Sequence, residues 1–136
     1  ACADMISRSY ASDIFELPIV VTRFSNIFGP GQLNFSALIP DAIRSAIGYS
    51  NFIPRGDGSQ VRDFLFVDDV VDLYLKLGQN VDKDPNKYIE EVFNAGSNNP
   101  KSVKSVVIEV FEAIGNKVDL EDALSIMNDK NNFREI

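Results

Sequence analysis

Two polar stretches carry the side chains that could do chemistry in this 136-residue chain. The first, Thr22 to Gly31, directly follows a short apolar, β-branched run. Ligands of open α/β sheets bind at the carboxyl ends of the strands, where the Asn26 amide could act as donor and acceptor. The alternative is a tight turn in which Asn26 caps backbone groups.

The second stretch runs from Gly56 to Asp69 and has Arg62 at the entrance of a predicted strand. A guanidinium presents paired donors that match a phosphate group. The alternative for Arg62 is a surface ion pair with Asp57 or Asp63. The Gly-x-Gly of this stretch lacks the third glycine of a dinucleotide fingerprint and does not predict one.

Composition removes several classes of chemistry. The chain contains no histidine, which excludes Ser-His-Asp, Cys-His and His-Glu-x-x-His sites within it. Its one cysteine, Cys2, excludes an internal disulfide and fits a reducing cytoplasm. We expect Cys2 to be a small buried apolar residue rather than a reactive thiol. Adjacent acids at Asp68 and Asp69 are typical of a helix start, so no metal site is predicted.

Charge and hydropathy exclude further partners. The formal net charge of −7 disfavours non-specific binding to nucleic acid or to an anionic membrane. No apolar run approaches the ~20 residues that a membrane span needs. We expect no signal peptide and no membrane or nucleic-acid partner. The apolar fraction of 45% is ordinary for a globular protein, and the length allows one domain, residues 1–136.

Helices and strands alternate along the predicted chain, which indicates an α/β fold. Ser102 is a plausible N-cap of the last helix, and Gly115 ends it. The apolar strand 19–24 requires neighbours on both sides, so we expect it to belong to a larger sheet. The predicted elements are helix 1–11, strand 19–24, loop 25–32, helix 38–48, strand 63–67, helix 70–78, loop 79–91, strand 91–95, helix 103–114 and a polar tail from 119 to 136.

Taken together, the two polar stretches resemble the extended short-chain dehydrogenase/reductase family, the nucleotide-sugar epimerases and dehydratases. The matching segments are Arg23 to Pro30, Gly56-Asp57-Gly58, Arg62-Asp63, Val67-Asp68-Asp69 and Phe93 to Ser97. Within that family, Leu33 to Ser36 followed by Ile39-Pro40, together with the opening Ala1 to Asp4, looks most like CDP-glucose 4,6-dehydratases.

The resemblance implies a Rossmann-type fold whose N-terminal lobe holds NAD and whose smaller C-terminal lobe holds the nucleotide sugar. Asn26 would contact the diphosphate region, and Arg62 would pair with a phosphate. Phe24 and Ser25 would lie beside the nicotinamide. The nucleotide pocket would be lined by Asn34, Ile39 and Ile53, with Asn99 as a weaker candidate.

Such dehydratases oxidise the sugar at C4 with NAD, eliminate water across C5 and C6, and return the hydride to C6. The resemblance thus implies CDP-glucose as substrate, deoxysugar biosynthesis as context, a cytoplasmic location and a homodimer or larger homo-oligomer. The alternatives are a related epimerase or reductase acting on UDP-, GDP- or dTDP-sugars, and a non-catalytic binding or assembly module on the same scaffold.

The departures from the family pattern lie at both ends of the chain: Phe133-Arg134-Glu135-Ile136 resembles the family's approach to its last segment, which is not present. The chain has neither the glycine-rich loop nor the Tyr-x-x-x-Lys pair, whose lysine would fall just before Ala1. We therefore expect a C-terminal substrate-binding part, cut at both ends, that holds no catalytic residues. By itself it would have little or no activity and would not bind NAD.

Overall fold

A computed structural model of the chain describes residues 2–12, 15, 17–89, 91–115 and 125. These residues divide into two compact units, each built from two separate stretches of chain. The first unit comprises the described residues of 1–27 and 65–97, and the second those of 28–64 and 98–136. The elements are α1 (Cys2–Ala11), β1 (Val21–Phe24), β2 (Asn26–Phe28), α2 (Leu38–Ala46), β3 (Val61–Arg62), β4 (Phe64–Phe66), α3 (Val67–Lys83), α4 (Pro85–Tyr88), β5 (Val92–Ala95), β6 (Lys101–Ser102) and α5 (Val103–Ile114).

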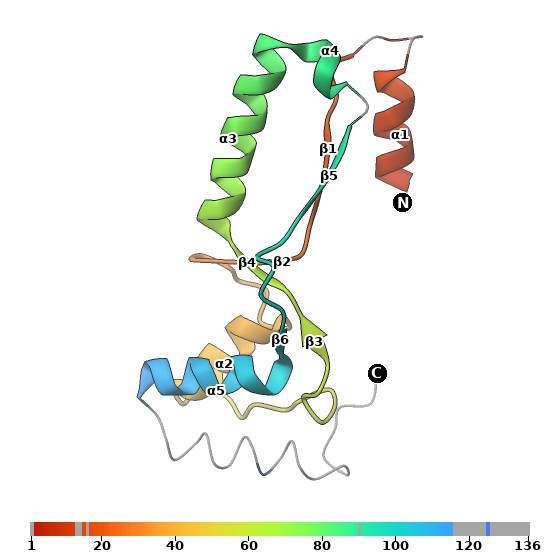
Figure 1. Ribbon diagram of the computed structural model, residues 1–136. Helices are drawn as coiled ribbons and strands as arrows, with labels where there is room; N and C mark the ends of the chain where they lie inside the picture. The colour runs from red at the N-terminus through yellow and green to blue at the C-terminus, as the bar shows by residue number, and fades with distance from the viewer. Residues whose placement is uncertain (1, 13–14, 16, 90, 116–124, 126–136) are drawn as a thin grey trace. The chain divides into compact units, whose positions relative to one another are not determined.

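The first unit has helices on both faces of a parallel strand pair (Figure 1). Strands β1 and β5 pair in parallel from Val21 opposite Val92 to Phe24 opposite Ala95. Successive side chains of a strand point to opposite faces. Phe24 contacts Tyr74 of α3, whereas Arg23 pairs with Asp4 of α1, so the two helices cover opposite faces. This arrangement confirms the α/β prediction.

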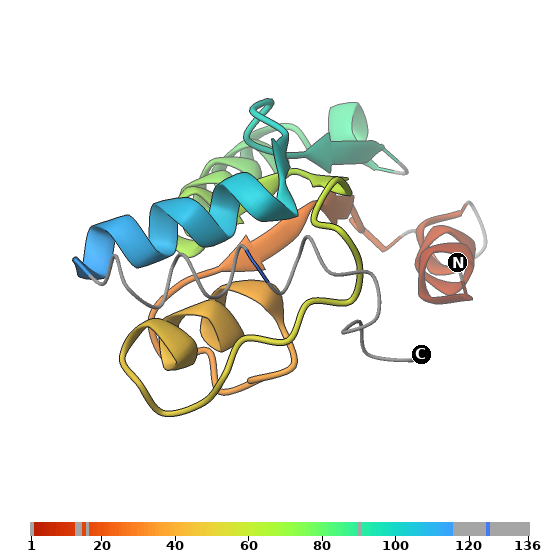
Figure 2. The ribbon, with the colours of Figure 1, turned by 90° about the horizontal axis from the view of Figure 1, so that it is seen from below.

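The second unit is held together by the packing of α2 against α5, which lie side by side in Figures 1 and 2. Small residues on α2 allow close approach to the larger side chains of α5. Leu38 and Val110 pack against the edge of this core. The buried core consists of Ala42, Ala46, Phe52, Val107 and Phe111.

Helix α5 also anchors the turn that leads to β3. Its first backbone N–H groups donate to that segment, Val103 to the Gln60 carbonyl and Lys104 to the Gly58 carbonyl, each at 2.9 Å. Gly58 has a φ of +76°, a conformation that side chains disfavour, which explains the glycine at this turn. Strand β3 then pairs antiparallel with β6, which places Arg62 opposite Lys101.

The start of α5, which forms this anchor, is stabilised by an N-cap hydrogen bond. The Ser102 Oγ accepts a hydrogen bond of 3.1 Å from the Ser105 N–H, as predicted. We expect Ser102→Ala to lower the free energy of unfolding by about 1 kcal/mol, because a helix N–H loses its partner. Urea titration followed by circular dichroism measures this change. Ser102→Asp, which retains an acceptor, is the control, and equal losses for both variants would contradict the capping role.

Three predictions from the sequence are wrong. Segment 25–32 contains β2, which pairs with β4, because strands of three residues give too short a pattern to recognise. Segment 79–91 is largely helical, since α3 continues to Lys83 and α4 begins at Pro85, a favourable first helical residue. Cys2 is exposed rather than buried. The predicted tail, 119–136, lies outside the described residues except for residue 125. No helix within the described ranges is both long and apolar enough to cross a membrane.

Candidate functional site

The carboxyl edge of the β1–β5 pair carries the first group of predicted site residues. Ser25 follows β1 directly, and its backbone N–H donates to the Ala95 carbonyl at 3.0 Å, so the parallel pairing extends one residue beyond the strands. The Ser25 Oγ is buried and has no hydrogen-bond partner among the described residues. A buried hydroxyl without a partner is costly, which marks this edge as a place for a polar ligand group.

Phe24 and its neighbour Thr22 are held by Tyr74, a residue that was not among the predicted site residues. The Phe24 and Tyr74 rings are 5.3 Å apart and tilted by 56°. The Thr22 Oγ1 and the Tyr74 hydroxyl oxygen are 3.3 Å apart and share a hydrogen bond. Because Tyr74 is about 50 residues from Phe24 in the sequence, no local pattern connects them.

Asn26 lies in β2 and is exposed. It has an interaction partner in the structure, so it is not a free group at the sheet edge. Phe24, Ser25 and Asn26 are consecutive, and all three belong to the first unit.

In the second unit, Asn34 lies in a turn that leads into α2. Its side-chain oxygen accepts from the Ser36 N–H at 3.2 Å and from the Ser36 Oγ at 2.6 Å. The Phe35 ring lies under the Arg44 guanidinium, 5.0 Å from its centre. Arg44 lies in the last turn of α2, within the predicted helix, but nothing in the local sequence pattern singles it out.

The apolar residues predicted for the nucleotide pocket are partly accessible. Ile39 is half-buried at the start of α2. Ile53 is 39% exposed between the buried residues Phe52 and Pro54. Asn99 is exposed just before β6 and has a partner in the structure.

Arg62 is exposed in β3, and among the described residues its guanidinium donates only to the carbonyl of the preceding residue, Val61, at 2.9 Å. The surface ion pair weighed as its alternative is not formed among the described residues. Asp57 is engaged elsewhere, since its Oδ1 accepts from both the N–H and the hydroxyl of Ser59.

The charge next to Arg62 is already neutralised. Lys101, its cross-strand partner, donates to both carboxylate oxygens of Glu109 at 2.6 and 2.7 Å. Within the described ranges, Arg62 is therefore a cation without an acid partner. Such a guanidinium can bind an anion with paired hydrogen bonds.

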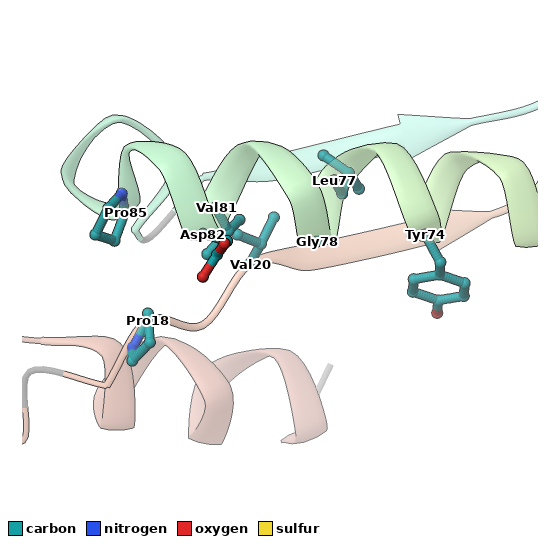
Figure 3. A pocket seen from close by; sticks show the side chains of 8 residues that line it. All are labelled: Pro18, Val20, Tyr74, Leu77, Gly78, Val81, Asp82 and Pro85. Carbon is teal, nitrogen blue, oxygen red and sulfur yellow. The ribbon is translucent and has the colours of Figure 1, made fainter.

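The first unit also has an open hollow of about 520 Å³ beside α3. Figure 3 shows Tyr74 at one end of it and Pro85 at the other, with Val20 facing Val81 and Asp82. None of its lining residues belongs to the predicted site. The described part of the chain contains no group of three or more cysteine or acidic side chains placed to hold a metal ion.

The chain is similar to a family of known proteins. The model of the family described as the NAD dependent epimerase/dehydratase family matches residues 1–96. The low-salt glycan biosynthesis protein Agl12 of Haloferax volcanii is 33% identical over 133 residues, which cover 96% of this chain and 38% of that protein.

Two solved structures are also similar. The dTDP-glucose 4,6-dehydratase of Bacillus anthracis, in complex with NAD, has a TM-score of 0.64 and 30% identity, covering 98% of this chain and 37% of that one. The UDP-glucose 4-epimerase of Thermotoga maritima, with UDP-glucose, has a TM-score of 0.69 and 27% identity, covering 85% and 36%. The chain thus spans a little more than a third of the length of these relatives.

Proposed function

Because the chain belongs to the NAD dependent epimerase/dehydratase family, we propose that it is the nucleotide-sugar-binding part of an NAD-dependent 4,6-dehydratase acting on CDP-glucose. The proposal is that residues 1–136 form the C-terminal domain of a longer, cytoplasmic enzyme, and that the NAD-binding lobe and the catalytic acid and base lie outside them. The chain by itself is then inactive.

The observation that carries this proposal is the state of Arg62. Its exposed guanidinium has no acid partner among the described residues, while neighbouring Lys101 is neutralised by Glu109. Arginine pairs bidentately with phosphate, and the similar epimerase structure contains the diphosphate-linked sugar UDP-glucose. Arg62 accordingly binds a phosphate of the nucleotide sugar, and Asn26 is the residue of the first unit that we assign to the diphosphate region.

The remaining site residues have distinct roles in this proposal. Asn34, Ile39 and Ile53 line the nucleotide pocket, and Asn99 contributes at its edge. Ile53 lies between two buried residues, which fix the backbone that presents its side chain to the nucleotide. Partly exposed apolar side chains beside a few polar groups are typical of small-molecule sites.

Phe24 and Ser25 are the residues of this chain that suit NAD. The buried Ser25 hydroxyl without a described partner can bond to a polar group such as a carboxamide, and Phe24 supplies an apolar surface beside it. When bound, NAD serves as the hydride acceptor and donor of the reaction. The chain's own residues bind and orient the sugar nucleotide and keep water from this edge.

CDP-glucose as the substrate rests on the segment from Leu33 to Ser36 and on Ile39-Pro40. The similar proteins described above include a dTDP-glucose 4,6-dehydratase and a UDP-glucose 4-epimerase, so the experiment compares the three bases directly. A homodimer or larger homo-oligomer is supported by α1, whose Met5, Ile6 and Tyr10 are 69%, 58% and 47% exposed. Exposed apolar patches of this kind mark protein interfaces.

The test is turnover by the full-length protein. With NAD and CDP-glucose we expect a 4-keto-6-deoxy sugar product and no net accumulation of NADH. UDP-glucose and dTDP-glucose are the matched substrates, and faster turnover of either would contradict the base assignment.

Other products identify the alternatives. A C4-epimerised sugar would favour the epimerase function. The similarity to the Thermotoga maritima epimerase is the observation that supports this alternative. The binding module would be favoured by two observations together. The protein would bind nucleotides without turnover, and its gene would not encode Tyr-x-x-x-Lys upstream of Ala1.

A further inference from the structure

The turn from Leu33 to Ala37 holds the Asn34 side chain in a defined hydrogen-bonding state. Its Oδ1 accepts two hydrogen bonds from Ser36, one from the backbone N–H and one from the hydroxyl. The Ala37 N–H donates to the Asn34 carbonyl at 3.0 Å and closes the turn. The amide oxygen is therefore occupied, and the Nδ2 group, which only donates, has no acceptor among the described residues.

The turn is anchored to the core of the second unit through Arg44. The Arg44 guanidinium lies 5.0 Å from the centre of the Phe35 ring, within the range of a cation–π interaction. Arg44 is on α2, between the buried residues Ala42 and Ala46. Leu33 is 78% exposed, so the turn is open to a ligand. Asn34 is thus a prearranged donor on a fixed support.

Pyrimidine bases differ in what they offer such a donor. Cytosine has an acceptor at N3, whereas uracil and thymine have an N3–H donor at the same position. A donor facing a donor leaves both groups unpaired, and an unpaired buried polar group is costly. Sites built around one hydrogen bond therefore discriminate strongly between ligands that differ at that group.

We propose that Asn34 selects the base by donating from Nδ2 to N3 of cytosine, and that Arg44 is a positioning residue that acts through Phe35. This inference rests on the proposed function, which brings a nucleotide to this turn. It adds to that function the base atom that is recognised, N3 of cytosine, and the residue that positions Asn34, namely Arg44.

The decisive variant is Asn34→Asp. Aspartate retains an oxygen for both Ser36 donors but replaces the Nδ2 donor with an acceptor, which suits the N3–H of uracil. We expect the ratio of the Kd for UDP to the Kd for CDP to fall at least about tenfold, measured by calorimetric titration of the full-length protein. CDP and UDP carry the same diphosphate, so the repulsion from the added charge cancels in this ratio.

The control variant is Asn51→Asp, which adds the same charge at an exposed position of the same unit. We expect its UDP-to-CDP ratio to equal that of the wild type. A ligand-side test needs no mutation: 3-deaza-CDP, which has C–H in place of N3, should bind the wild type about tenfold more weakly than CDP.

Positioning by Arg44 has its own readout. We expect Arg44→Gln to lower the UDP-to-CDP ratio and Arg44→Lys, which retains a cation over Phe35, to restore part of it. A general loss of stability would instead weaken the binding of CDP and of UDP equally and leave the ratio unchanged.

The outcomes separate this inference from the proposed function. Absence of binding of every nucleotide to the wild type would overturn the proposed function. Binding of CDP and 3-deaza-CDP with equal affinity would overturn the reading of N3 by Asn34 while the function stands. An unchanged ratio in Asn34→Asp would do the same.

Discussion

Arg62→Ala is expected to weaken the binding of CDP by ~10- to 100-fold in the full-length protein. Hydrogen bonds to charged groups contribute about 1.5–3 kcal/mol, which corresponds to a loss of this size. Lys101, directly across the strand pair, donates to both oxygens of Glu109. Calorimetric titration with CDP measures the change, and the free energy of unfolding should stay within about 0.5 kcal/mol of the wild type.

The matched control for this prediction is Arg55→Ala. Arg55 is also exposed in the second unit, seven residues earlier, and its loss removes the same charge. Equal losses of affinity for the two variants would show that net charge, rather than a specific contact, attracts the nucleotide. Arg62→Lys should be intermediate, because an ammonium lacks the paired donors of a guanidinium.

Phe111→Ala is expected to lower the free energy of unfolding of the second unit by about 3–5 kcal/mol. Phe111 has 0% exposure and belongs to the cluster that joins α5 to α2 and to Phe52. Truncation leaves a cavity between two helices whose packing holds this unit together. The same helix anchors the turn before Arg62, so this variant should also lose nucleotide affinity.

Denaturant unfolding measures the first effect, and Ile114→Ala on the same helix is the control. Ile114 is 39% exposed, and its truncation should cost less than about 1 kcal/mol. Similar losses for both variants would contradict the assignment of the core. Loss of nucleotide binding at temperatures where Phe111→Ala is still folded would separate the anchoring effect from unfolding.

The elements with complete local signals were predictable from sequence. Helix 103–114 was predicted with the bounds that the structure has, because an apolar stripe, an N-cap serine and a terminal glycine all act within a few residues. Gly115 has a φ of +81°, as a left-handed helix end requires. The parallel strands were found for a similar reason, since each is a short apolar run bounded by turn residues.

The short strands and the supports of the site were not predictable. Strands β3 and β6 have two residues each and exist because α5 and the turn before Arg62 bring them together. Tyr74 and Arg44 act on Phe24 and Phe35 through contacts that only the fold creates. Periodicity describes the face of one element and carries no information about its partner.

The state of Arg62 illustrates the same limit. Two acids close in sequence, Asp57 and Asp63, made an ion pair a reasonable prediction. In the structure, the Asp57 carboxylate instead accepts hydrogen bonds from the Ser59 N–H and hydroxyl. Closeness in sequence therefore did not predict the partner of Asp57, because this acid is already hydrogen-bonded within its own turn.

The division of each unit between two stretches of chain has a consequence for synthesis on the ribosome. Strand β1 pairs with β5, which follows it by about 70 residues, and α2 packs against α5, which follows by about 60. Chains emerge at about 5–20 residues per second, so each half-unit waits for seconds beside its incomplete partner. Neither unit can fold before the other has begun to emerge. Nascent β1 thus exposes an unpaired edge, which makes it a natural substrate for chaperones during translation.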